Sequence, residues 1–117
     1  MVEIQFESVS VSEAGDYFQV HFENEPDNLS AYFLIQFQCE FEDDDGYYME
    51  SNDEQFCGNF EIKAATLSRD SLSLEVPSSR WKSVTIHFKA DEADYKRLEN
   101  ILDTMFDKKL RHVARDA

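Results

Sequence analysis

The sequence predicts an α+β fold: a mostly antiparallel sheet of about seven or eight short strands, with one C-terminal helix packed on it. Apolar and polar residues alternate in short runs across residues 2–89, which is the period of half-buried strands. Apolar residues then recur every three or four positions across residues 91–110, as in an amphipathic helix. Because strand and helix signals do not alternate along the chain, an antiparallel arrangement is favoured over a parallel one.

The first apolar alternation changes phase part-way. Val2, Ile4 and Phe6 share one parity, whereas the next apolar residues, Val9 and Val11, have the other. A β-bulge or a bend between the two sets would account for the change.

The clearest strand covers residues 33–41. Its apolar residues share one parity and leave the other face polar: Phe33, Ile35, Phe37, Cys39 and Phe41. Such a run is not produced by the 3.6-residue period of a helix. After an acidic turn, a returning strand is expected with Tyr47 and Met49 on one face and Tyr48 and Glu50 on the other.

Phe18, Val20 and Phe22 alternate in another expected strand, and three further strands complete the order. One runs from Phe60 to Leu67, its hairpin partner covers residues 72–76, and a last strand covers residues 84–88. Pro77 ends the second of these, because proline cannot donate to a strand ladder.

A helix is expected over about residues 91–110. Acidic residues fill its first turn and basic residues lie near its end, which suits the helix dipole. Leu98, Leu102 and Met105 would form the apolar stripe that packs on the sheet. Residues 111–117 are expected to be a frayed tail.

Length and composition predict one domain over residues 1–117. The chain is 42% hydrophobic and includes ten Phe, five Tyr and one Trp, which is enough to bury a core. No apolar run reaches the roughly 20 residues that span a bilayer, and no signal peptide is visible. We therefore expect a cytoplasmic protein with Cys39 and Cys57 as thiols, and the sequence leaves open whether they ever pair.

Charge is distributed unequally along the chain. Residues 1–62 contain sixteen Asp and Glu and no Lys or Arg, whereas residues 63–117 contain nine Asp and Glu and eleven Lys and Arg. This balance disfavours binding to nucleic acid or to anionic membranes, because phosphate groups are bound by Lys and Arg. An acidic surface instead attracts a cationic partner. Solubility alone is the alternative explanation of the charge.

Catalysis is not expected. The three His residues, His21, His87 and His112, accompany no Ser or Cys in a nucleophile elbow, and the three Gly form no phosphate-binding loop. No pairing of Cys and His suits zinc. We therefore expect a protein that is not an enzyme and holds no cofactor or metal.

Acidic residues are most crowded around the hairpin expected after residue 39. The candidate binding residues there are Glu40, Glu42, Asp43, Asp44, Asp45, Tyr48, Glu50, Asp53 and Glu54. Three explanations stay open: a surface that recognises a protein, a solvated acidic turn, and a small-ligand or calcium-binding module that uses loop 42–54. The calcium spacing of an EF-hand is not met, because Tyr48 stands where that loop needs Gly. Aromatic side chains among the acids favour recognition, since interfaces use aromatic anchors with a charged rim.

Three short motifs follow one another within residues 32–76. They are Tyr32-Phe33-Leu34-Ile35-Gln36, Asp45-Gly46-Tyr47-Tyr48-Met49-Glu50 and Leu67-Ser68-Arg69-Asp70-Ser71-Leu72. In order and spacing this stretch resembles the immunity protein 10 family of bacterial polymorphic toxin systems. It departs from the family pattern before Phe60, where only Gly58 stands in place of a more Gly-rich turn.

The resemblance implies a small α+β protein that binds and neutralises a toxin inside the producing cell and has no enzyme activity. It carries over Tyr48 and Glu50 as family-like positions. Together with the charge, it leads us to expect a cytoplasmic immunity protein that occludes a basic toxin electrostatically and sterically. Nucleases are among the candidate toxins, because they need cationic clefts. Whether the chain forms a homo-oligomer is left open.

Overall fold

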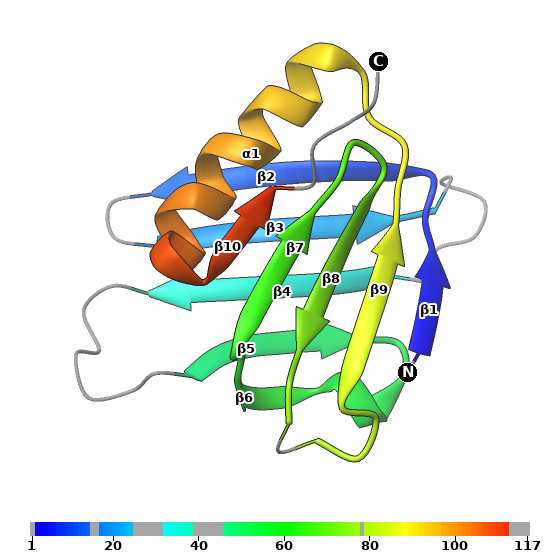
Figure 1. Ribbon diagram of the computed structural model, residues 1–117. Helices are drawn as coiled ribbons and strands as arrows, with labels where there is room; N and C mark the ends of the chain where they lie inside the picture. Colours follow the sequence, from blue (N-terminus) through cyan, green and yellow to red (C-terminus); the bar gives the residue numbers. More distant parts are fainter. Residues whose placement is uncertain (1, 15–16, 25–31, 39–45, 78, 113–117) are drawn as a thin grey trace.

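The computed structural model describes residues 2–14, 17–24, 32–38, 46–77 and 79–112. Over these residues ten strands form two sheets, with one α-helix beside them (Figure 1). The strands are β1 (Val2–Gln5), β2 (Ser8–Ala14), β3 (Tyr17–Glu23), β4 (Tyr32–Gln38), β5 (Gly46–Ser51), β6 (Gly58–Glu61), β7 (Ala64–Leu67), β8 (Ser71–Glu75), β9 (Ser83–His87) and β10 (Leu110–His112). The helix is α1 (Glu92–Phe106), and two 3-10 turns are η1 (Glu54–Phe56) and η2 (Asp107–Lys109).

The ten strands divide equally between the two sheets. The first sheet has the order β1-β9-β8-β7-β10, and the second has the order β2-β3-β4-β5-β6. The second sheet is antiparallel throughout, whereas β1 runs parallel to β9 and β10 runs parallel to β7 in the first. The α+β class and the mostly antiparallel pairing are confirmed. The expectation of one sheet of seven or eight strands is wrong, because the chain builds two layers.

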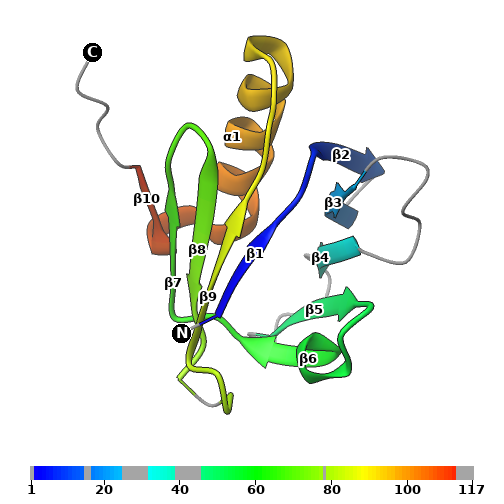
Figure 2. The ribbon, with the colours of Figure 1, turned by 90° about the vertical axis from the view of Figure 1, so that its right-hand side faces the viewer.

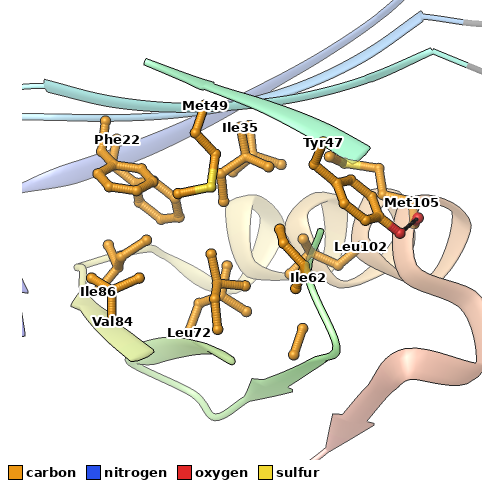
Figure 3. Close-up of a cluster of buried hydrophobic side chains, with 14 of the residues drawn as sticks. Phe22, Ile35, Tyr47, Met49, Ile62, Leu72, Val84, Ile86, Leu102 and Met105 are labelled. Atoms are coloured by element: carbon orange, nitrogen blue, oxygen red, sulfur yellow. Dashed lines mark hydrogen bonds between the residues drawn. The ribbon is translucent and has the colours of Figure 1, made fainter. Parts of the chain in front are cut away.

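The core lies between the facing sheets (Figure 2). Phe22, Ile35 and Met49 of the second sheet point toward Leu72 and its neighbours on the first, and all are buried (Figure 3). The helix packs against β2 and β3 of one sheet and β7 and β10 of the other. Apolar side chains from both layers and from the helix therefore form one continuous buried cluster.

The chain crosses between the sheets at two places that local alternation does not reveal. β1 belongs to the first sheet and β2 to the second, with the buried Phe6 at the crossing. The phase change seen in the sequence thus marks a change of sheet. The strand expected from Phe60 to Leu67 is two strands, β6 in the second sheet and β7 in the first, and the fully buried Ile62 lies between them.

The helix is shorter than expected at its C-terminal end. The Asp91 side chain caps its N-terminus by accepting a hydrogen bond from the backbone N–H of Asp94 at 2.8 Å. The helix ends at Phe106 and not near residue 110, because Asp107 adopts a φ of 48°, outside the helical range. Residues 110–112 then form β10, so the first two residues of the expected frayed tail are in a strand; residues 113–117 lie outside the described part.

The apolar stripe of the helix lies as predicted. Leu98, Leu102 and Met105 are all buried against the sheets. Within the part of the chain that the structure describes, no helix is long and apolar enough to cross a membrane.

Candidate functional site

The unequal charge of the sequence corresponds to one of the two sheets. All five strands of the second sheet lie within residues 8–61, and that span contains no Lys or Arg. Every Lys and Arg of the chain follows β6, the first being Lys63. The second sheet is therefore built without a cationic side chain.

The face of the second sheet that points away from the core is polar and ordered in rows of cross-strand neighbours. Alternation sets this face, because Phe18, Val20 and Phe22 of β3 point into the core and the residues between them point away from it. One row joins Ser10, His21, Leu34 and Glu50, and the next joins Ser12, Gln19, Gln36, Tyr48 and Asn59. We call the outward side chains of β2–β5 the outer face.

Glu50 is the centre of a hydrogen-bonded cluster on the outer face. Tyr32 donates its hydroxyl hydrogen to Glu50 Oε2 at 3.0 Å, and Tyr48 donates to Glu50 Oε1 at 2.8 Å. All three side chains are half-buried. The two phenols therefore hold the carboxylate in place at the surface, each at its own oxygen.

The same hydrogen bonds shift the titration of the two phenols. Hydrogen bonding to Glu50 raises the pKa of Tyr32 and that of Tyr48 above the usual 10.0, with smaller contributions from burial and from the negative charge of Glu50. Because a proton is bound more tightly in the folded state, this interaction stabilises the fold below pH 10 and is lost as the pH rises through the raised pKa values.

We expect the substitution Glu50→Gln to lower the pKa of both Tyr32 and Tyr48 toward 10.0, because it removes the charged acceptor. NMR titration of tyrosine labelled at Cζ measures each phenol separately. Glu61→Gln is the control, since it removes one carboxylate from the same sheet without touching either hydroxyl. Unchanged titration of both phenols in Glu50→Gln would show that the cluster does not form in solution.

A groove of about 310 Å³ lies on the outer face beside Glu50. Its lining residues come from four neighbouring strands: Ser10, Val11, Ser12, Gln19, His21, Tyr32, Leu34 and Glu50. Gln19 is itself fixed, because its amide donates to Tyr17 Oη at 2.9 Å and to Gln36 Oε1 at 3.1 Å. The groove thus joins one acidic group to a lining that is mostly polar and includes the apolar Val11 and Leu34.

The structure brings together some of the residues predicted for the site and leaves others apart. Tyr48 and Glu50 meet in the cluster, whereas Asp53 caps η1, accepting from the backbone N–H of Gln55 at 3.3 Å and from its side-chain amide at 2.8 Å. Glu54 is exposed on η1. The remaining predicted residues lie outside the described part of the chain: Glu40, Glu42, Asp43, Asp44 and Asp45.

Of the eight described residues that line the groove, only Glu50 was predicted as a binding residue. Tyr32, Gln19 and His21 were not among the candidate binding residues, yet all three line the groove. A usable signal was parity: Gln19 and His21 alternate with Phe18, Val20 and Phe22, and Tyr32, just before strand 33–41, has the parity of Gln36 on its polar face. This parity places them on the same face as Glu50 once the strands are adjacent.

Metal-ligand groups are not assembled in the described ranges. There, no group of three or more His, Cys, Asp and Glu is placed to hold a metal ion. The alternative of a calcium module in loop 42–54 rests on residues 42–45, which lie outside these ranges. Cys57 is a free, exposed thiol whose sulfur lies 3.2 Å from the carbonyl oxygen of Ser51, and Cys39 is not described.

The hairpin turn of the third family-like motif has a structural role. Arg69 donates from Nη2 to the carbonyl oxygen of Ala90 at 2.9 Å, and its guanidinium lies 4.7 Å from the centre of the Tyr95 ring. These contacts tie the β7–β8 turn to the start of α1. The site is therefore centred on the first two motifs.

Comparison of the chain with protein-family models, with curated proteins and with solved structures finds no significant match.

Proposed function

We propose that this chain is a cytoplasmic immunity protein that binds a cognate toxin and neutralises it by electrostatic and steric occlusion. The observation that carries the proposal is the outer face. Five adjacent strands contain no Lys or Arg, and their exposed side presents the half-buried Tyr32–Glu50–Tyr48 cluster. Such a surface is complementary in charge to a cationic protein.

The side chains of the outer face suit a protein interface. Tyrosine is enriched in such interfaces, because it offers a large contact area and a hydroxyl group at a low cost in side-chain entropy. Tyr32 and Tyr48 already hold fixed positions through Glu50, so binding would not need to order them.

The charge of the sheet explains how the partner would be captured. A surface with acids and without bases attracts a basic protein at long range and raises the association rate by roughly 10- to 1,000-fold at low salt. Once docked, the two-layer domain would cover the cationic cleft of the toxin. A nuclease suits this scheme, because its cleft binds phosphate groups with Lys and Arg.

The resemblance to the immunity protein 10 family supports the same proposal. Its family-like positions Tyr48 and Glu50 are joined by a hydrogen bond, and Tyr32, the first residue of the first motif, holds the other oxygen of the same carboxylate. Two motifs separated along the sequence therefore meet at one site on the outer face.

Co-expression with the product of the adjacent gene tests the function. We expect that product to arrest growth alone, and this chain to restore growth and to co-purify with it. Glu50→Lys should abolish rescue, because it places a cation at the centre of the outer face. Glu75→Lys is the matched control, since it makes the same charge change at an exposed residue of β8 in the first sheet.

Two results would contradict the proposal. If the neighbouring product is not toxic, or if wild-type protein neither rescues growth nor forms a complex, the immunity function is wrong. If Glu75→Lys abolishes rescue and Glu50→Lys does not, the outer face is not the interface.

A further inference from the structure

We propose that the groove beside Glu50 receives an arginine side chain of the partner protein, an inference that rests on the proposed function. The groove, the cluster and the surrounding charge each point to a guanidinium group, and each is a separate observation on the outer face.

The cluster leaves Glu50 with a particular set of vacant acceptor positions. An ionised carboxylate offers about four lone-pair positions, two on each oxygen. Among the described residues, Tyr32 occupies one position on Oε2 and Tyr48 occupies one on Oε1, which leaves one position on each oxygen. Two parallel acceptors are what the planar fork of arginine binds, whereas a lysine ammonium acts as a single point charge.

No cation of the described part of the chain forms an ion pair with Glu50. The ion pairs there join Glu3 to His87, Glu7 to Lys89, Asp94 to Arg97, and His112 to Glu99 and Asp103. The second sheet has no Lys or Arg, so within the described residues its strands supply no cation to Glu50, and a cationic group of another molecule can pair with it.

The shape and lining of the groove also suit arginine. Leu34 is the cross-strand neighbour of Glu50, so an aliphatic stem lying over Leu34 would bring its head group to the carboxylate. Tyr32 lines the same groove and offers an aromatic ring to the guanidinium plane. Ser10, Gln19 and His21 also line the groove, and their polar atoms can accept hydrogen bonds from the remaining N–H donors.

Titration with two short blocked peptides, acetyl-Gly-Arg-Gly-amide and acetyl-Gly-Lys-Gly-amide, tests the inference by NMR. We expect the arginine peptide to shift the signals of Tyr32, Leu34 and Glu50, and the lysine peptide to bind several-fold more weakly. Glu50→Gln should weaken arginine binding about tenfold, because the charged acceptor is lost. Glu61→Gln, which removes a carboxylate outside the groove, should change it less than about twofold.

Equal shifts from both peptides, shifts centred away from the groove, or unchanged binding by Glu50→Gln would each overturn the arginine site. These outcomes are distinguishable from failure of the proposed function. If the protein rescues growth but its groove does not bind the arginine peptide, the immunity function stands and the arginine site is wrong. If the groove binds the arginine peptide but the protein does not rescue growth, the groove binds arginine as proposed and the immunity function is wrong.

Discussion

Phe22→Ala is expected to destabilise the protein by about 3–5 kcal/mol, which is the usual cost of deleting a buried aromatic ring from a core. Phe22 has no exposed surface and joins the two sheets. Its ring lies 6.1 Å from that of Phe6, at the crossing from β1 to β2, and 5.7 Å from that of Phe88, just after β9. Since domains of this size are stable by about 5–15 kcal/mol, the loss is a large fraction of the total.

Urea unfolding followed by fluorescence measures this loss. Trp81 is the single tryptophan and is buried between Phe56 and Phe60, with ring-centre distances of 5.0 and 5.6 Å, so its emission reports the contact between the layers. The control is His21→Ala, on the same strand but on the outer face, which should cost less than about 1 kcal/mol. Similar costs for both variants would mean that β3 does not bury the face shown in Figure 3.

The face on which each side chain lies was predictable from local alternation. Tyr47 and Met49 are buried and Tyr48 and Glu50 lie on the opposite face, as expected from a strand of period two. Alternation depends only on the backbone of one strand and on the presence of a core. It therefore needs no knowledge of which strands are neighbours.

The assignment of strands to sheets was not predictable in the same way. An alternating strand has the same pattern in either layer, so one sheet and two sheets give equal local signals. Phe60, Ile62 and Ala64 keep the same alternation where the chain passes from β6 in the second sheet to β7 in the first, and Ile62 between the two strands is buried. The short β10 was missed because its basic residues suited the end of a helix, whereas Asp107 ends the helix with a positive φ.

The candidate site shows the same division between local and non-local information. Glu50 and Tyr48 were recognised from one short segment, because acidic and aromatic residues crowd there and because both belong to the second family-like motif. Tyr32 was not, because its contact with Glu50 spans 18 residues and depends on the register of β4 against β5. The absence of Lys and Arg from residues 1–62 was visible in the sequence. Only the strand order shows that β2 to β6 within this stretch form one sheet.

Reversing two charges on the second sheet is expected to slow association with the toxin by about tenfold or more at low salt, if the proposed function holds. Glu23→Lys with Glu61→Lys removes two exposed carboxylates from β3 and β6 and introduces two cations, so the attraction at long range is weakened. The dissociation rate should change much less, because charges away from the contact centre mainly affect encounter.

The matched control is Glu75→Lys with Glu92→Lys, which changes the net charge equally at exposed residues of β8 and α1. Stopped-flow mixing with the purified toxin over a range of salt concentrations gives both rates. The association rates of the wild-type and control proteins should fall steeply as the salt concentration rises. The second-sheet variant should associate more slowly and depend less on salt, because it has less attraction to screen. Equal slowing by both pairs would show that only total charge matters. The location of acids on one sheet would then have no part in capture, and the interface would have to be sought elsewhere on the molecule.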